Sequence, residues 1–293
     1  MKLLYFSFLS VLLAIMTVSC SDDDETVAPP PSAISEVRVE PRVGGAAIFW
    51  NVPADSNYLY VAARFEKKES MVKQLASVYS DSILVEGLLN KFEYDFSLQT
   101  YNADEVGGEI LHTEKVRPIR RPIEVTYSLD DAVEVPLTAD MIDTYTQEQS
   151  EGPKENLLDD NINTYWHSAW SSGKAPLPHH IQINFEEPTK LGAFNYTLRQ
   201  GGNDQHDPKR FDLQVSEDGA TWETVWVSAP NLPIAPETDE FTLNMNKNFE
   251  SKYFRIRIIE TAANGQWTYL SGIEVLSLGE ELTDLEEVAE ENY

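Results

Sequence analysis

Alternation of apolar and polar residues is the feature that most constrains how this chain can fold. In several stretches of the second half, apolar side chains occupy every second position, as in Ile181, Ile183 and Phe185. Successive side chains of a strand point to opposite faces, so each stretch has one apolar face and one polar face. Strands of this kind form two sheets that pack over one core. The pattern therefore predicts an all-β chain.

The first half shows the same period in shorter stretches. Val37 alternates with polar neighbours, and residues 92–101 predict a long strand with one apolar face. Short strands separated by turns are typical of a β-sandwich. Pro118 and Pro122 flank two arginines and mark a boundary, because proline does not continue a strand ladder. With 293 residues, we predict two β-sandwich domains in tandem, at residues 33–118 and 122–278.

The N-terminus has the composition of a secretory signal. Lys2 precedes an apolar run from Leu3 to Val18, which is too short for a comfortable membrane span. Cys20 is the only cysteine, so it has no internal disulfide partner. We predict a signal peptide at residues 1–19 and an acidic, proline-containing linker at residues 20–32. A plain secreted protein with one leftover thiol is the alternative.

The position of Cys20, directly after Ser19, resembles the lipobox of bacterial lipoproteins. This resemblance implies that cleavage leaves Cys20 as a lipidated N-terminus. The acidic run at residues 21–25 resembles the export tag on surface lipoproteins of Bacteroidota, although it could also be a solvated linker. Together they imply a protein that is anchored by lipid in the outer membrane and exposed at the cell surface.

Net charge narrows the possible partners. The formal charge is -27 at pH 7, and residues 279–293 hold seven acids and no base. Such a chain repels phosphate backbones and anionic lipid, which argues against nucleic acid and against membrane contact beyond an anchor. A neutral partner fits better. The C-terminal residues 279–293 are expected to form a disordered acidic tail, with a weak helical stripe through Leu282, Leu285 and Val288 as the alternative.

A second motif lies in residues 159–168, where Asp159, Asn161 and Thr164 precede Trp166. Asp and Asn favour turns, and the aromatic residues anchor the turn on a core. The run resembles the coagulation factor 5/8 type C, or discoidin, domain, which includes carbohydrate-binding module family 32. Asp160 stands where that family usually has Gly.

Other motifs follow in the family's order. Asp218-Gly219 predicts a hairpin by itself, because Gly accepts positive φ there. The surrounding Ser-x-Asp-Gly-x-x-Trp run and a later Tyr-Phe-Arg-Ile run resemble the same family. The resemblance implies a discoidin-like, galactose-binding-like jelly roll with its ligand site in loops at one end.

The resemblance also implies a glycan site. A sugar offers hydroxyls and one apolar face, so its site needs an exposed ring and a few fixed polar groups. The residues carried over are His167, Arg199 and Trp267, with Asn264 and Gln200 as helpers. Trp267 stands among polar residues with little apolar cover nearby. Less specific roles are a turn cap for His167 and a surface ion pair for Arg199.

Packing roles are assigned to three aromatic side chains, those of Trp166, Trp170 and His179. We expect Trp166 to lie in the core and Trp170 to pack rather than bind a ligand. His179 and His180 alternate along a strand, so their rings point to opposite faces and cannot share a metal ion.

Members of this family often hold a structural Ca²⁺ in the Asp-to-Thr turn, since carboxylate and carbonyl oxygens suit that ion. The closing Glu of the family aligns with Gly272, and Glu274 follows two residues later. Calcium therefore stays an open expectation. The ligands that the resemblance implies are Asp159, Thr164, Glu274 and the backbone oxygens of Leu157 and Asn161.

In the first domain, Val85-Glu-Gly-Leu88 followed by Tyr94 resembles the corner of fibronectin type III domains. There a Tyr hydroxyl bonds the backbone to close a turn between two sheets, and Trp50 matches the core Trp. Nothing in this domain clusters His, Cys or paired carboxylates, so we expect a spacer or interaction module.

No His-Glu-x-x-His, Gly-x-Ser-x-Gly or phosphate-loop motif is present, which favours a non-catalytic protein. We predict a surface lipoprotein that binds glycans for a polysaccharide-utilisation system, with a glycan transporter or glycosidases as partners. Two alternatives remain. One is an adhesion or protein-protein interaction module that uses the same loops, and the other is an accessory fragment of a glycosidase or sialidase.

Overall fold

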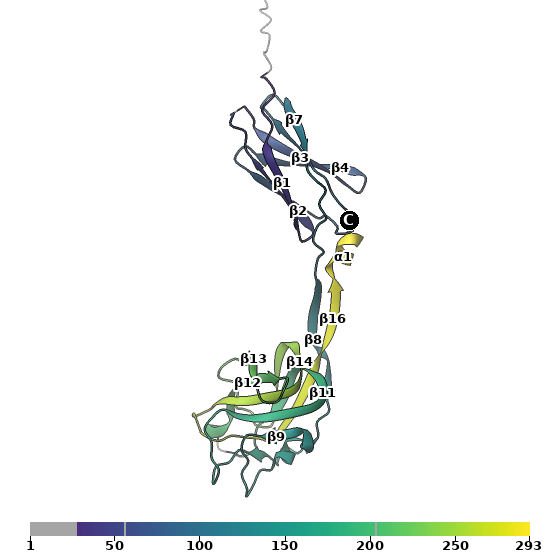
Figure 1. The fold of residues 1–293 in the computed structure, drawn as a ribbon. Helices are drawn as coiled ribbons and strands as arrows, with labels where there is room; N and C mark the ends of the chain where they lie inside the picture. Colours follow the sequence, from purple (N-terminus) through teal and green to yellow (C-terminus); the bar gives the residue numbers. More distant parts are fainter. Residues whose placement is uncertain (1–27, 56, 203) are drawn as a thin grey trace, which may run out of the picture. The chain divides into compact units, whose positions relative to one another are not determined.

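The computed structural model describes residues 28–55, 57–202 and 204–293, and these divide into two compact units. The first unit comprises the chain up to Arg121 together with residues 286–293, and the second comprises residues 122–285 (Figure 1). The predicted signal peptide, Cys20 and most of the predicted linker lie outside the described residues. Within the described part, no helix combines the length and apolarity that a membrane crossing requires.

The first unit is a β-sandwich of three and four strands. One sheet has the order β1-β2-β5 and the other β4-β3-β6-β7, with every pair antiparallel. Trp50 and Phe96 lie in the core between them, as alternation predicts. The strands are β1 (Ser35–Arg42), β2 (Gly45–Asn51), β3 (Tyr60–Lys67), β4 (Ser70–Ser77), β5 (Ser82–Glu86), β6 (Ser97–Tyr101) and β7 (Gly107–His112).

Tyr94 closes a turn in this unit. Its hydroxyl accepts a hydrogen bond from the backbone N–H of Leu89 at 3.0 Å, and its ring is buried. The chain therefore turns here, and the continuous strand predicted over residues 92–101 is wrong. Only Ser97–Tyr101 pairs as a strand, while Phe92 is 44% exposed.

The second unit is built around one long antiparallel sheet with the order β13-β12-β14-β11-β16-β8 and with β9 paired to β11. A short second ladder pairs β10 with β15. The strands are β8 (Ile123–Val135), β9 (Ile142–Thr144), β10 (Trp166–His167), β11 (His179–Thr197), β12 (Pro208–Ser216), β13 (Glu223–Val227), β14 (Glu240–Thr261), β15 (Tyr269–Leu270) and β16 (Gly272–Asp284).

Two of these strands serve both layers of a sandwich. The ladder between β11 and β14 shifts register between Asn184 and Thr189, and again between Leu191 and Ala193. Bulges of this kind bend a strand, so its two halves can belong to different layers. The first half of β11 pairs with β9, and the second half pairs with β16. The result is the predicted jelly-roll sandwich.

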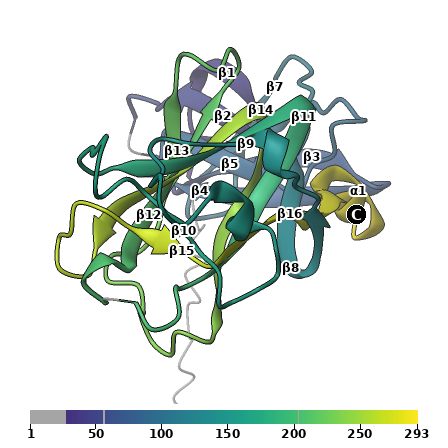
Figure 2. The ribbon, with the colours of Figure 1, turned by 90° about the horizontal axis from the view of Figure 1, so that it is seen from below.

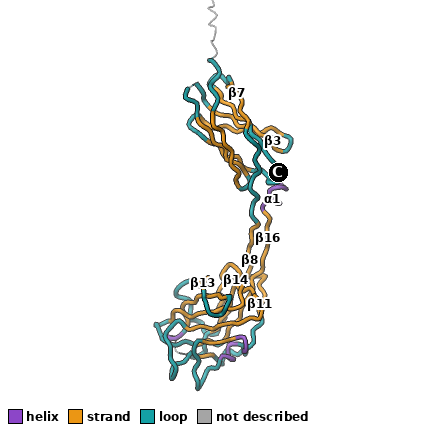
Figure 3. Tube along the Cα trace, in the orientation of Figure 1, coloured by secondary structure: helices purple, strands orange, loops and turns teal. Residues whose placement is uncertain are grey.

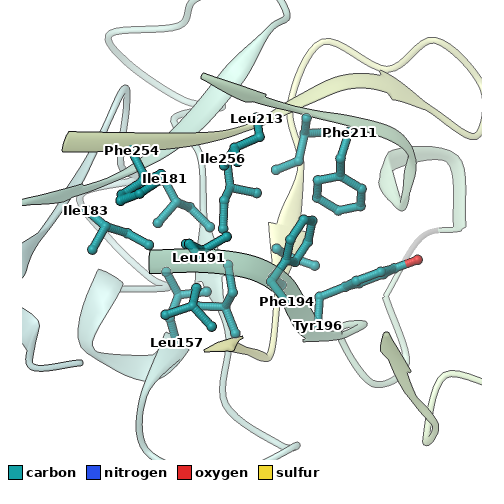
Figure 4. Close-up of a cluster of buried hydrophobic side chains, with 14 of the residues drawn as sticks. Leu157, Ile181, Ile183, Leu191, Phe194, Tyr196, Phe211, Leu213, Phe254 and Ile256 are labelled. Atoms are coloured by element: carbon teal, nitrogen blue, oxygen red, sulfur yellow. The ribbon is translucent and has the colours of Figure 1, made fainter. Parts of the chain in front are cut away.

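The core of this sandwich holds the apolar faces that the sequence predicts. Ile181, Ile183, Phe254 and Ile256 are all fully buried and lie together in Figure 4. Trp166 is also fully buried, as expected. Each large side chain removed from water stabilises the fold by about 1.5–3 kcal/mol, which fixes the scaffold under the loops.

The Asp218-Gly219 turn joins β12 to β13 as predicted. Gly219 has a φ of +71°, and the Asp218 carboxylate accepts hydrogen bonds from the N–H groups of Ala220 and Thr221. These charge-assisted bonds hold the pKa of Asp218 at about 2.

Residues 279–293 are ordered, so the prediction of a disordered acidic tail is wrong. β16 continues to Asp284 against β8, and the helix α1 (Leu285–Glu291) follows. Glu286 is buried in the first unit, where its carboxylate pairs with Arg121 at 2.9 Å and accepts the N–H of Asn90 at 2.7 Å. Disorder was predicted from the negative charge of residues 279–293, and the ion pair of Glu286 with Arg121 neutralises part of that charge.

Candidate functional site

A cavity of about 460 Å³ lies among loops of the second unit, which Figure 3 draws in teal. It brings together His167, Arg199 and Trp267, three of the residues predicted for the site. Trp267 is half-buried, so its ring is neither hidden in the core nor free in solvent. The other lining residues are Glu151, Trp170, Gly201, Gly202, His206 and Tyr269.

The short ladder between β10 and β15 positions two of these loops. His167 pairs with Tyr269 and Trp166 pairs with Leu270, which places the segments before and after them side by side (Figure 2). Trp166 and Tyr269 are buried beneath the loops. The ladder therefore fixes His167 beside the segment that carries Trp267, although about a hundred residues separate them in the chain.

Arg199 is held between aromatic rings. Its guanidinium carbon lies 3.7 Å from the ring centroid of Tyr165 and 5.0 Å from that of Tyr269. Stacking of this kind orients a guanidinium without occupying its N–H donors. The Nε atom is buried and has no hydrogen-bond partner among the described residues. Because that atom is sealed from solvent, the groups that can reach a ligand are the two terminal nitrogens of the guanidinium, which form no hydrogen bond within the described residues.

Glu151 lies close to Arg199 but is engaged elsewhere. Its carboxylate accepts hydrogen bonds from the Tyr165 hydroxyl at 2.6 Å and from Nε1 of Trp170 at 2.9 Å. The Tyr165 hydroxyl holds the pKa of Glu151 below its usual range, and the bond from Trp170 and the nearby charge of Arg199 add to this effect. Glu151 therefore stays ionised and orients the two aromatic side chains.

The two histidines of the cavity are neutral at physiological pH. Burial lowers the pKa of His167 and also that of His206. Nδ1 of His167 lies 2.7 Å from the carbonyl oxygen of Ser168, so this nitrogen donates and Nε2 is left as an acceptor. The His206 ring lies 4.8 Å from that of Trp267, at an angle of 33°. Both imidazoles can exchange hydrogen bonds with a neutral ligand.

Trp170 lines the cavity and is 39% exposed, so it lies outside the core, and the expectation that it packs rather than binds a ligand stays a prediction. The loop that carries Trp170 is held by the buried side chain of Glu148. One oxygen of its carboxylate accepts hydrogen bonds from the backbone N–H groups of Trp170 at 3.0 Å and Ser171 at 2.8 Å. These bonds, with one from the Ser171 hydroxyl, place the pKa of Glu148 far below its usual range. No local sequence pattern predicts these hydrogen bonds, because Glu148 and Trp170 are 22 residues apart in the chain.

Two predicted helpers lie outside the cavity lining. The amide of Gln200 donates to the carbonyl oxygens of Leu198 at 2.9 Å and Glu237 at 2.5 Å, so its donors are already used by the backbone. Asn264 is exposed in a turn with a φ of +56°. The structure thus separates these two residues from the group around Arg199.

The residues expected to bind calcium form a turn that is closed by its own hydrogen bonds. The hydroxyl of Thr164 donates to the Asp159 carboxylate at 2.7 Å, and the carbonyl oxygen of Asn161 accepts the Thr164 N–H. Glu274 accepts instead from the amide of Asn195 at 3.1 Å. Within the described ranges, no group of three His, Cys, Asp or Glu side chains is placed to hold a metal ion. The predicted set also includes the Thr164 hydroxyl and two backbone carbonyl oxygens, so calcium binding stays a prediction.

Family models match both units. A model described as the F5/8 type C domain matches residues 142–275, and a model described as a domain of unknown function, DUF4959, matches residues 31–118. A sialidase of Micromonospora viridifaciens is 24% identical over 136 residues, which cover 46% of this chain and 20% of the sialidase. An A type blood N-acetyl-alpha-D-galactosamine deacetylase of Flavonifractor plautii is 43% identical over 53 residues, or 18% of this chain and 7% of the deacetylase. The match therefore spans a fifth or less of each of these relatives.

Solved structures resemble the second unit at low identity. The family 32 module of Clostridium perfringens NanJ in complex with galactose is 17% identical, covers 53% of this chain and 100% of its own, and has a TM-score of 0.38. An F5/8 type C domain from Bacteroides fragilis is 16% identical, covers 50% of this chain and 97% of its own, and has a TM-score of 0.39. The F5/8 type C family model thus matches residues 142–275, a range that lies within the jelly-roll sandwich of the second unit.

Proposed function

We propose that the second unit binds a neutral glycan, without catalysis, in the cavity lined by His167, Arg199 and Trp267. The observation that carries this proposal is the state of Arg199. Its guanidinium is fixed between two aromatic rings, and its terminal nitrogens have no acceptor among the described residues. A sugar hydroxyl can accept from these nitrogens without displacing a hydrogen bond within the protein.

The rest of the lining suits a sugar as well. Trp170 and Trp267 offer partly exposed rings for the apolar face of a pyranose. The neutral imidazoles of His167 and His206 can donate to or accept from hydroxyls. Since the charges of Arg199 and Glu151 lie close together in the same cavity, the site has little net charge. A neutral saccharide therefore fits better than a strongly charged one.

The cavity lacks the pair of acids that glycoside hydrolysis commonly uses. Glu151 is the only carboxylate among the described residues that line it. Hydrolysis normally needs two carboxyl groups on either side of the glycosidic bond. The hydroxyl of Tyr165 also holds the pKa of Glu151 low, which is the opposite of what a general acid requires. These features support binding without turnover.

We further propose that the protein is a surface lipoprotein, lipidated at Cys20, that serves a polysaccharide-utilisation system. The signal-like N-terminus and the following acidic run support this role. Its partners would be an outer-membrane glycan transporter or glycosidases. The first unit would act as a fibronectin type III-like spacer. The three-plus-four arrangement of its strands and the bond from Leu89 to the Tyr94 hydroxyl support that assignment.

Affinity electrophoresis and a glycan array test the binding proposal. The first probes are galactose and GalNAc-beta-1,3-galactose, which are named as bound ligands of similar solved structures. We expect Trp267→Ala and Arg199→Ala to lose glycan binding. Arg210→Ala is the matched control, because Arg210 pairs with Glu260 outside the cavity and should leave binding unchanged.

Retention of all glycan binding by both variants would refute the assigned site. Binding of a protein ligand through these loops, in the absence of any glycan binding, would favour the adhesion alternative. Turnover of an aryl glycoside that is lost on changing one acid would favour the enzyme fragment.

A further inference from the structure

A second cavity, of about 300 Å³, lies on the outer face of the sheet formed by β11, β12 and β14. His180 of β11, Gln214 of β12 and both Arg255 and Arg257 of β14 contribute to it. The register places His180 opposite Arg257, and Gln214 opposite Arg255, so these side chains share one face. Tyr145 and the segment from Pro176 to Pro178 form its other walls. The two cavities have no lining residue in common.

This second cavity is positive although the chain as a whole is strongly acidic. Its described lining contains no carboxylate. Arg257 forms a two-point ion pair with buried Asp212, with bonds of 2.7 and 2.5 Å, and is thereby neutralised. Arg255 has no such partner. Its Nε donates to the side-chain oxygen of Gln182 at 2.9 Å, and no carboxylate among the described residues pairs with it.

Arg255 is nevertheless held in place. Its guanidinium carbon lies 3.8 Å from the ring centroid of Trp222, a stacking distance that fixes the plane of the group. With Nε bonded to Gln182, the two terminal nitrogens are left to donate to a ligand. Carboxylates and sulfate esters match that geometry, because two of their oxygens can accept from one guanidinium.

The surrounding charges also favour an anion. Burial and the nearby Arg255 and Arg257 lower the pKa of His180 to about 4, so His180 is neutral at physiological pH. By strand register the nearest acid is Asp212, which Arg257 neutralises, and the next is Asp143 on β9, which lies 3.8 Å from the ammonium of Lys154. The unbalanced charge at this place is therefore the positive charge of Arg255.

The aromatic ring of Tyr145 lines the same cavity as Arg255. Tyr145 is 49% exposed, and its ring stacks on His180 with centroids 5.2 Å apart and an angle of 24°. An exposed flat ring beside a fixed guanidinium is the combination that a charged sugar needs, with its apolar face on the ring and its anion on the arginine.

We propose that this outer-face cavity is a second ligand site, which takes an acidic saccharide whose carboxylate or sulfate ester binds Arg255 and whose ring packs on Tyr145. The site is separate from the loop cavity and does not depend on the function proposed for that cavity. A protein with both sites could bind a mixed glycan at a neutral residue and at an acidic one.

Isothermal titration of the full chain tests this site. The probes are trigalacturonate for a carboxylate and a 6-sulfated galactose disaccharide for a sulfate. Methyl-esterified trigalacturonate and the unsulfated disaccharide are the neutral controls. We expect at least one acid probe to bind roughly tenfold or more tightly than its neutral form, the scale of one charge-assisted hydrogen bond. Raising the salt concentration should weaken this binding.

Variants then locate the site. Arg255→Gln should weaken acid-probe binding by roughly tenfold or more. Tyr145→Ala, which changes an exposed side chain and should not disturb folding, should weaken it as well. Trp267→Ala should leave it unchanged. Equal binding of acid and neutral probes would overturn the proposal, as would no binding of either acid probe. Loss of acid-probe binding in Trp267→Ala, with Arg255→Gln unaffected, would also overturn it.

Discussion

Replacing Arg199 by Ala is the most informative test of the loop cavity, because the substitution should change both the affinity for the glycan and the stability of the second unit. The variant loses a guanidinium that donates to the ligand, and a hydrogen bond of that kind contributes about 1.5–3 kcal/mol. At about 1.4 kcal/mol for each factor of ten, the dissociation constant for the glycan should rise roughly 10- to 100-fold. The variant also loses stacking on Tyr165 and Tyr269, which contributes about 0.5–2 kcal/mol to folding.

Isothermal titration calorimetry and thermal melting separate these effects. The melting temperature of the second unit should fall by a few degrees, at roughly 2–4 °C per kcal/mol for a domain of this size. Arg199→Lys keeps the charge but loses the flat, forked donor set, so it should recover little affinity. A dissociation constant within about twofold of the wild-type value, in a folded Arg199→Ala protein, would refute the argument from the unsatisfied donor.

Four further predictions follow from other parts of the structure. Trp267→Ala should weaken glycan binding by about 0.5–1.5 kcal/mol while the melting temperature changes little, because the ring is only half-buried; unchanged titrations would exclude Trp267 from the site. Burial raises the pKa of Asp207 to about 7, above its ordinary value, so its contribution to stability is present at low pH and is lost as pH rises towards 7. Asp207→Asn should therefore stabilise the second unit at pH 8 but not at pH 4, and parallel melting curves across that range would contradict this. Tyr94→Phe should destabilise the first unit by about 1–3 kcal/mol, measured by denaturant unfolding, because it leaves the N–H of Leu89 without its partner; an unchanged midpoint would show that the turn does not need this bond. Under the calcium prediction, EDTA should lower the melting temperature and added calcium should restore it, because a bound ion stabilises the folded state; a melting temperature unmoved by EDTA would count against a bound ion.

Alternation predicted the sandwiches because burial of one face is a local property of each strand. Ile181 and Ile183 face the core whatever the order of the strands, and the sequence carries that information directly. Acidic composition misled the prediction for residues 279–293, because the pairing of Glu286 with Arg121 depends on a partner 165 residues away.

The candidate site was predictable only where a residue stood in a recognisable motif. His167 and Arg199 came from the resemblance to a family, and the structure places both in one cavity with Trp267. Glu151 and Tyr269 lie in no such motif. Their roles depend on the pairing of β10 with β15 and on hydrogen bonds between distant loops, which no local pattern encodes.

The central claim is that the loop cavity, and no other part of the second unit, binds a neutral sugar. The most direct measurement is an NMR titration that follows the indole N–H signals of the six tryptophans with GalNAc-beta-1,3-galactose as ligand. The account predicts shifts for Trp267 and Trp170, which line the cavity, and none for Trp166, which is fully buried, or for Trp222 on the outer face. Shifts confined to Trp222, or a set of neutral glycans that moves none of the six signals, would contradict it.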